Sequence, residues 1–257
     1  MKFLLSYSTD TGRCKPTNQD SLLIREARTE KGNLVLALIC DGMGGLEKGE
    51  LASKSIVDAF SEWFEHDLPQ YLMKEDLKED LRRDWGRIVQ VQNHTLSSFG
   101  RRNNLRLGST WTCLLILENG TYMIGHVGDT RVYRIRQDGC RLLTEDQTVV
   151  AREVKRGNLT WAQAEKDPRR NVLLQCIGAS KTVEPAFISG QSQPGEVFLL
   201  CSDGFRHQVG ADDFAEAFAP DQCRDEKTMT EKLRELIELN MQREETDNIT
   251  ALLIKTL

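Results

Sequence analysis

The chain has 257 residues, which suits one large domain or two small ones and is long enough to bury a substantial hydrophobic core. Its net charge of −5 at pH 7 argues against nucleic-acid and membrane-surface roles, because affinity for phosphate backbones depends on clustered Lys and Arg. No apolar run suits a signal peptide or a membrane span, and seven dispersed cysteines without a C-x-x-C pair are typical of free thiols in a reducing compartment, so a cytoplasmic protein is expected.

The first part of the chain predicts three strands followed by two long helices. Period-2 and wholly apolar patterns predict strands at 3–9, 21–26 and 34–40. The first two strands are joined by a polar connection, 10–20, that is rich in turn residues. Helical periodicity then extends over 47–64 and 75–99, and Trp63, Phe64 and Trp85 are interpreted as packing residues of these helices.

The middle of the chain changes to strand periodicity. Asn119-Gly120 separates strands expected at 110–118 and 121–127, and this pair suits the tight turn of an antiparallel hairpin. Asp138-Gly139 repeats the arrangement between 131–137 and 140–144. We therefore expect an antiparallel meander here, which makes a doubly wound parallel sheet improbable.

The segment at about 146–178 departs from this pattern. A helix is expected at 146–156, Gly157 ends it, and Thr160 with Gln163 has the form of a capping box that opens a second short helix. We interpret this segment as a mobile flap beside a functional site.

The remainder predicts two strands, two helices and a last strand. The strands are expected at 183–190 and 196–201, the helices at 212–219 and 228–243, and the last strand at 249–255. Thr228 and Glu231 suggest a capping box for the second helix. Because no linker or repeat divides the chain, residues 1–257 are expected to form a single domain.

Four aspartates stand at the ends of predicted strands. Asp41 begins the glycine-rich loop Asp41-Gly42-Met43-Gly44-Gly45, Asp129 and Asp203 follow two further strands, and Asp247 precedes the last one. One Asp-Gly pair is most simply a turn, but the recurrence favours a common site. Buried carboxylates repel one another unless a cation neutralises them, and an oxygen-only site suits Mg²⁺ or Mn²⁺ better than zinc. The four histidines have no metal-ligand spacing.

Two such ions can lower the pKa of a bridging water and neutralise a phosphoryl group, which points to phosphoester hydrolysis without a protein nucleophile. None of the cysteines has an arginine six positions later, so the loop of thiol-based phosphatases is absent from the sequence. Neither a Walker lysine loop nor G-x-G-x-x-G occurs, which argues against nucleotide-driven transfer.

Six short motifs resemble, in order and approximate spacing, those of the bacterial metal-dependent Ser/Thr protein phosphatases of type 2C. The resemblance covers nearly the whole chain, from Thr9 to Ile254, and each motif is weak alone. The motifs are Lys15-Pro16-Thr17-Asn18-Gln19-Asp20, Asp41-Gly42-Met43-Gly44-Gly45 with Gly49 and Ala52, Gly108-Ser109-Thr110, Gly128-Asp129-Thr130-Arg131, Ser202-Asp203-Gly204 and Asp247-Asn248-Ile249-Thr250.

The resemblance implies an α+β fold, a four-layer αββα sandwich of two antiparallel sheets flanked by helices, with a dinuclear Mn²⁺ or Mg²⁺ centre. Asp41 would bridge both ions, and Asp203 and Asp247 would complete the first. The Gly42 carbonyl and Asp20, directly or through water, would serve the second. A metal-activated water would attack phosphoserine or phosphothreonine in proteins.

Further implications concern a third ion, the partners and the flap. Asp129 matches the position that, with Asp203, holds a third and weaker ion in bacterial members. A eukaryotic-like Ser/Thr kinase would be the opposing enzyme, and 146–178 matches the family's flap. Nothing in the pattern demands more than a monomer.

Several positions depart from the family pattern. Lys15 stands where an arginine usually grips the phosphate, so we expect weaker substrate binding through a retained charge, with the chemistry kept. Met43 replaces a histidine proposed as general acid in many eukaryotic members. Leu46 and Gln147 stand where bacterial relatives often have histidines.

Two alternatives to a protein phosphatase stay open. The replacement at Lys15 suggests a regulatory or binding module that keeps the fold and metal but turns over little, and an enzyme acting on a small phosphoester is the other. Among single residues, Ser109 and Thr110 are expected to support the carboxylates by hydrogen bonds, and Arg131 to pair with a carboxylate. Arg206 is interpreted as a surface salt-bridge residue.

Overall fold

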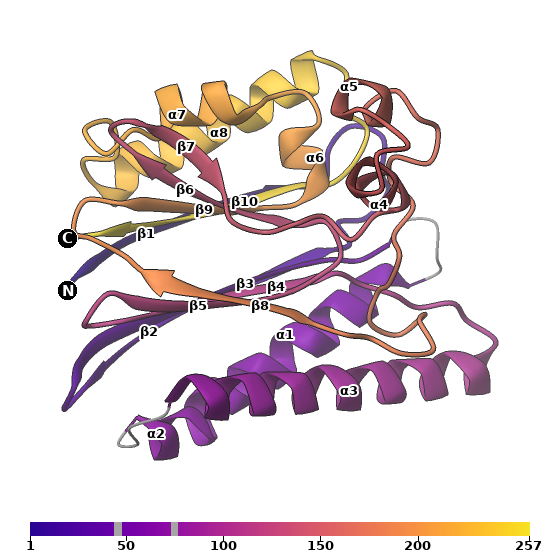
Figure 1. The fold of residues 1–257 in the computed structure, drawn as a ribbon, viewed down its shortest axis with the longest axis horizontal. Coiled ribbons are helices and arrows are strands. Elements are labelled where there is room, and N and C mark those ends of the chain that lie inside the picture. Colours follow the sequence, from indigo (N-terminus) through magenta and orange to yellow (C-terminus); the bar gives the residue numbers. More distant parts are fainter. Residues whose placement is uncertain (44–47, 73–76) are drawn as a thin grey trace.

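Two five-stranded antiparallel sheets lie face to face, and helices cover the outer face of each (Figure 1). The computed structural model describes residues 1–43, 48–72 and 77–257. The strand order of the first sheet is β1 (Phe3–Asp10), β10 (Ile249–Thr256), β9 (Val197–Cys201), β6 (Arg131–Arg136) and β7 (Gly139–Leu142). The order of the second is β2 (Asp20–Thr29), β3 (Gly32–Asp41), β4 (Trp111–Leu117), β5 (Thr121–Val127) and β8 (Ala186–Gln191).

The helices complete a four-layer sandwich, which confirms the expected αββα fold class. The second sheet is covered by α1 (Gly49–His66) and α3 (Leu77–Asn103), with the short α2 (Leu68–Tyr71) after α1. The first sheet is covered by α7 (Ala211–Ala217) and α8 (Glu226–Gln242), while α6 (Asp203–Arg206) follows β9 directly. None of the described helices is long and apolar enough to cross a membrane.

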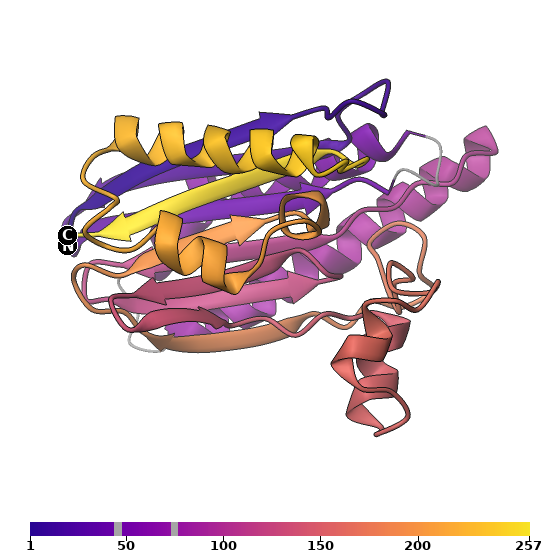
Figure 2. The ribbon, with the colours of Figure 1, turned by 90° about the horizontal axis from the view of Figure 1, so that it is seen from above.

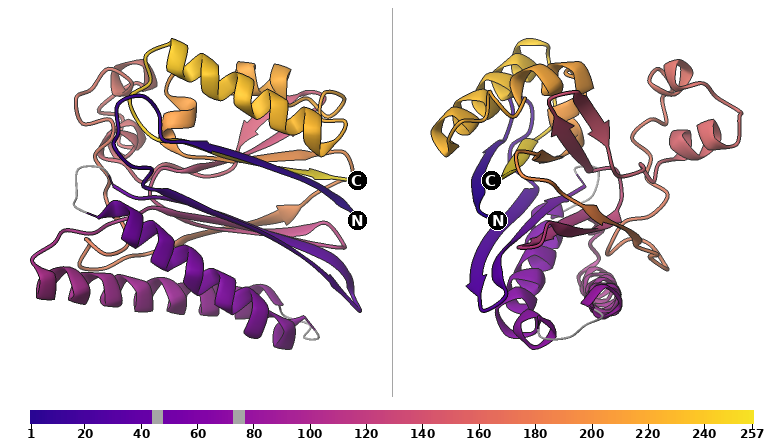
Figure 3. Two further views of the ribbon diagram at one scale, coloured as in Figure 1. Left: turned by 180° about the vertical axis from the view of Figure 1, so that it is seen from behind. Right: turned by 60° about the vertical axis from the view of Figure 1, so that its left-hand side comes forward.

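One segment projects from the sandwich. Between β7 and β8, α4 (Val149–Lys155) and α5 (Trp161–Ala164) extend to one side of the layers (Figure 2; Figure 3, right). The side chain of Thr160 accepts a hydrogen bond from the backbone of Gln163, and the two residues form the expected capping box. This segment coincides with the stretch interpreted as a flap.

Strand β3 is apolar throughout because both of its faces are buried. Leu34, Leu36 and Leu38 pack towards α1 and α3, whereas Val35, Ala37 and Ile39 pack between the sheets. The alternation follows from the two-residue period of a strand. The outer layer is closed by a cluster of fully buried aromatic rings, whose members are Phe60, Trp63, Trp85 and Trp111.

Two expectations about local structure are wrong. The middle of the chain is not one meander, because the β4–β5 hairpin belongs to the second sheet and the β6–β7 hairpin to the first. The chain changes sheets after Gly128, whose φ of +107° suits a sharp change of direction at a glycine. Helix α8 does not begin with the Thr228 capping box, since Asp225 is its N-cap and accepts a hydrogen bond from the Thr228 N–H.

The end of β5 is held by a buried histidine. His126 has no exposed surface; its Nδ1 lies 2.8 Å from Thr112 Oγ1 and its Nε2 lies 3.1 Å from the Glu145 carbonyl oxygen. These partners fit a neutral imidazole that accepts at Nδ1 and donates from Nε2. Burial lowers the pKa of His126 to about 4.

We expect His126 to destabilise the fold on acidification. The unfolded chain takes up the proton near pH 6.5 and the folded chain only near pH 4, so stability is lost as the pH falls between these values, by about 2 kcal/mol near pH 5. Urea unfolding at pH 7 and at pH 5 should show a smaller loss in His126→Gln, which has no titrating ring. Equal losses in the two proteins would contradict this assignment.

Candidate functional site

Aspartates from both sheets meet at one end of the sandwich. Asp20 begins β2 and pairs with Asp41 at the end of β3, because these antiparallel strands place the start of one beside the end of the other. Asp203 follows β9, and Asp247 precedes β10, the neighbour of β9. Asp129 follows the end of β5. The structure therefore brings together all five aspartates that the sequence singled out.

The aspartates strongly oppose one another's ionisation. Burial, together with the charge of Asp203, raises the pKa of Asp20 to about 7. Burial and the charges of Asp20 and Asp203 raise the pKa of Asp41 well above its usual range. Both carboxylate oxygens of Asp20 are buried and make no hydrogen bond of normal geometry, and the nearby hydroxyls of Thr250 and Ser202 offset the rise in pKa only in part. Buried neighbouring carboxylates can all be ionised at once only when a cation neutralises their charge.

The oxygen atoms of the aspartates suit a hard divalent ion, although these side chains do not yet converge on one point. Among residues 1–43, 48–72 and 77–257, no group of three or more His, Cys, Asp or Glu side chains could hold a metal ion without rearrangement. The unpartnered oxygens of Asp20 supply donors that such an ion would satisfy.

The backbone around Asp41 is held closely. Thr110 Oγ1 accepts a 2.8 Å hydrogen bond from the Asp41 N–H, and Ser109 Oγ donates a 2.9 Å bond to the Asp41 carbonyl. These hydroxyls therefore support Asp41 through its main chain. A Cβ at Gly42 would lie 2.4 Å from the Gly49 carbonyl oxygen, so no larger residue fits there. The expected loop residues Gly44, Gly45 and Leu46 lie outside the described residues.

Lys15 faces the acidic cluster from the connection between β1 and β2. Its Nζ lies 3.0 Å from Asp247 Oδ1, and its side chain is 28% exposed. Asn248 holds this connection in place: its Nδ2 donates to the carbonyls of Thr11 and Thr17, at 2.9 and 3.1 Å, and its Oδ1 accepts from the Gln19 N–H at 3.0 Å. Lys15 thereby keeps a charge at the open side of the cluster.

A second group of charges lies on the other side of Asp203. Arg131 Nε and Nη2 donate to the two oxygens of Asp146 at 2.8 and 2.7 Å, so Arg131 pairs with a carboxylate as expected. The interpretation of Arg206 as a surface residue is wrong, since its side chain is only 12% exposed and lies between Asp129 and Asp146. Arg206 is the last residue of the short helix α6, which begins at Asp203.

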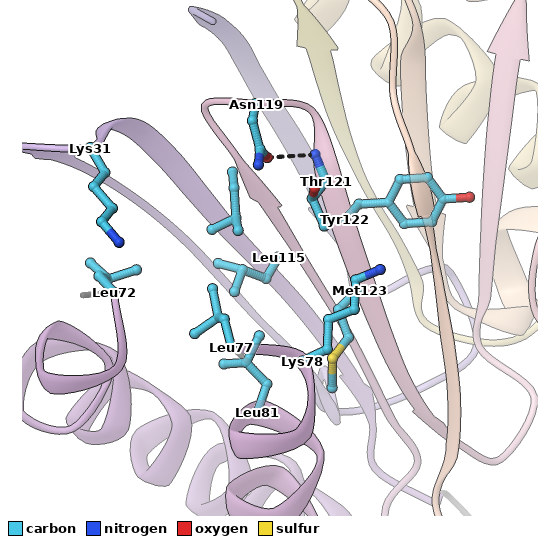
Figure 4. Close-up of a pocket in the computed structure, with 11 residues that line it drawn as sticks. Lys31, Leu72, Leu77, Lys78, Leu81, Leu115, Asn119, Thr121, Tyr122 and Met123 are labelled. Atoms are coloured by element: carbon cyan, nitrogen blue, oxygen red, sulfur yellow. Dashed lines mark hydrogen bonds between the residues drawn. The ribbon is translucent and has the colours of Figure 1, made fainter. Parts of the chain in front are cut away.

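Two cavities differ in their relation to these groups. One, of about 400 Å³, lies between α5 and the charges just described, and its lining includes Arg131, Trp161 and Arg206. Another, of about 280 Å³, lies near the start of α3 beside β4 and β5, and leucines dominate its described lining (Figure 4). Only the first adjoins the acidic end.

The family model for protein phosphatase 2C matches residues 13–249. The chain belongs to the protein phosphatase 2C family.

Relatives and solved structures agree with this membership over nearly the whole chain. A putative protein phosphatase 2C-type of Streptococcus pyogenes is 29% identical over 253 residues, covering 97% of this chain and 96% of the relative. The serine/threonine phosphatase of S. agalactiae has a TM-score of 0.85 at 29% identity and full coverage of both chains. The catalytic domain of the phosphatase PstP in complex with two manganese ions has a TM-score of 0.77 at 25% identity, also with full coverage of both chains.

In this member of the family, the sequence analysis missed a link between two of the aspartates. His207 Nε2 lies 3.4 Å from Asp203 Oδ2, and its Nδ1 lies 3.2 Å from Glu245 Oε2. Glu245 Oε1 in turn accepts 2.9 Å bonds from the N–H groups of Thr246 and Asp247. His207 stands four residues after Asp203, but Glu245 is distant in sequence from both, and no spacing rule connects a histidine with such a distant carboxylate.

We expect Asn248→Asp to destabilise the phosphatase by about 2 kcal/mol, because a carboxylate oxygen would replace the amide donor and face two backbone carbonyls. Urea unfolding measures the loss. Asn171→Asp is a suitable control, since Asn171 is exposed and a surface change of this kind costs at most about 0.5 kcal/mol. Equal stability of the two variants would contradict the role given to Asn248.

Proposed function

We propose that the chain hydrolyses phosphoserine and phosphothreonine in proteins, with Mn²⁺ or Mg²⁺ bound at the acidic end of the sandwich. The observation that carries the proposal is the convergence of Asp20, Asp41, Asp203 and Asp247 in a chain of the protein phosphatase 2C family. The similar solved structure from S. agalactiae is named as a serine/threonine phosphatase, which supports phosphoproteins as the substrate class.

We propose a two-ion centre with the ligands that the family resemblance implies. Asp41 would bridge the ions, Asp203 and Asp247 would complete the first site, and the Gly42 carbonyl and Asp20 the second. The unpartnered oxygens of Asp20 and the purely oxygen donor set support this assignment. The two manganese ions of PstP support the number of ions.

Bound ions of this kind lower the pKa of water and neutralise charge on a phosphoryl group. The chain's own residues would do the rest. Lys15, placed beside Asp247, would attract and orient the phosphate as a point charge. The segment 146–178, proposed as a flap, would contact the substrate protein through the wall of the 400 Å³ cavity that includes Trp161.

We also propose the compartment, the opposing enzyme and the oligomeric state of the protein. All seven cysteines are free, which supports a reducing compartment and therefore the cytoplasm. A Ser/Thr kinase is the natural opposing enzyme for a phosphatase of this specificity. Because every proposed ligand comes from one chain, we propose that residues 1–257 act as a single catalytic domain and as a monomer.

We expect Asp203→Asn and Asp41→Asn to lower metal-dependent turnover by about 1,000-fold or more, because a lost metal ligand removes several kcal/mol of transition-state stabilisation. The assay is phosphate release from a phosphothreonine peptide with Mn²⁺, with Mg²⁺ and after chelation. Asp58→Asn, on the exposed face of α1, is the matched control and should keep full activity. Wild-type turnover in either active-site variant would refute the assigned roles.

We expect Lys15→Arg to lower KM several-fold and leave kcat nearly unchanged, because a guanidinium can bind phosphate through two parallel hydrogen bonds. Lys15→Ala should raise KM about tenfold, equivalent to about 1.4 kcal/mol of binding. Steady-state kinetics on the same peptide separate KM from kcat.

The lysine also motivates the one competing function, a binding module with little turnover. Tight capture of the phosphopeptide by the Mn²⁺-loaded protein without phosphate release would favour that function. Restored turnover in Lys15→Arg would then identify the lysine as its cause.

A further inference from the structure

The two carboxylates expected to hold a third metal ion, Asp129 and Asp203, already have partners from within the chain. Consecutive residues supply them: Arg206, the last residue of α6, contacts Asp129, and His207 contacts Asp203. Both follow Asp203-Gly204-Phe205 directly, so the turn that places Asp203 also places these two side chains. The two carboxylates of the expected third site are therefore already paired with side chains of the protein.

Arg206 is a buried cation that contacts two carboxylates through Nη2, whereas its Nε is buried without a hydrogen-bond partner among the described residues. Its Nη2 lies 3.1 Å from the Asp129 carbonyl oxygen, 3.4 Å from Asp129 Oδ2 and 3.5 Å from Asp146 Oδ2. The side chains of Asp129 and Asp146 are only 6% and 8% exposed, so water screens their charges poorly. A guanidinium placed between two buried carboxylates stabilises both.

Two guanidinium groups face two carboxylates on this side, although burial and the charge of Asp203 keep the pKa of Asp129 raised, to about 7. Asp146 also accepts two hydrogen bonds from Arg131, so the two carboxylates Asp129 and Asp146 are matched by two guanidinium groups. A divalent ion at Asp129 would have to displace Arg206 or lie beside it. Either arrangement is unfavourable, because an unpaired buried guanidinium is costly and like charges repel at short range.

The aspartates of the proposed two-ion centre have fewer cationic partners than Asp129 and Asp146. For the cluster of Asp20, Asp41, Asp203 and Asp247, the ion pairs of the described residues are those of Asp247 with Lys15 and of Asp203 with His207. Four carboxylates therefore face one lysine and one histidine, and they keep the negative charge that divalent ions require. Counted by ion pairs, this cluster therefore has the larger excess of negative charge.

We propose that the guanidinium of Arg206 serves as a built-in cation in place of a third metal ion, so that Asp129 is a partner of Arg206 and the centre holds two ions. The inference rests on the proposed two-ion centre. It assigns Arg206 a positioning role: it fixes Asp129, at the end of β5, and Asp146, at the start of the flap segment, next to the helix that carries Asp203.

The test counts Mn²⁺ ions per full-length chain, by equilibrium dialysis with electron paramagnetic resonance of free Mn²⁺, at saturating metal. We expect two ions in the wild type and in Asp129→Asn. Arg206→Ala should bind one further ion, because it exposes the Asp129 carboxylate to metal, and Arg206→Lys, which keeps the charge, should bind two. Circular dichroism checks the folding of each variant, and the Asp129→Asn count carries the test if Arg206→Ala does not fold.

Each outcome bears on a different claim. Three ions in the wild type, reduced to two by Asp129→Asn, would overturn the inference and leave the proposed function standing. Two ions in a folded Arg206→Ala would also overturn it, because Arg206 would then exclude nothing. Binding of no Mn²⁺ by the wild type would overturn the two-ion centre and the inference with it.

Discussion

The structure depends on keeping several like charges buried at one end of a sandwich. Asp20 and Asp41 lie side by side on paired strands, and the pKa of each is raised by burial and by neighbouring carboxylates. A flexible scaffold would relieve this repulsion by letting the side chains separate into water. The strands that carry these aspartates must therefore be rigid, and the packing of the sheets and helices provides this rigidity.

Rigidity comes from three apolar layers. One lies between the sheets, and one lies under each helical layer. The layer beneath the second sheet is packed tightly enough that a Cβ at Gly125 would lie 2.2 Å from the ring of Trp111. Because Trp111 begins β4 and Gly125 lies near the end of β5, this contact fixes the part of the hairpin from which the chain turns towards Asp129. Aromatic packing beneath the second sheet thus helps to set the position of Asp129.

The sequence predicted those features that depend on local pattern. The apolar run before Asp41 and the Asn119-Gly120 turn each carry their own signal, and both elements formed as expected. The sheet that each hairpin joins could not be read from the sequence, because the choice is made by packing between sheets after Gly128. The orientation of Arg206 was also beyond local pattern. A short helix absent from the prediction turns it towards Asp146, which is distant in sequence.

The same limit explains how the acidic end divides its charges. From the sequence, every aspartate at a strand end is an equally good candidate for a metal ligand, because the sequence does not show which charged side chains surround it in the fold. In the fold, Asp129 and Asp146 face Arg131 and Arg206, whereas Asp41 faces other carboxylates. A guanidinium held by packing neutralises a carboxylate permanently, while a metal ion does so only when bound, and only the metal also acts on a phosphoryl group. Arginines on one side of Asp203 and divalent ions on the other would thus confine the exchangeable charge to the place where chemistry needs it.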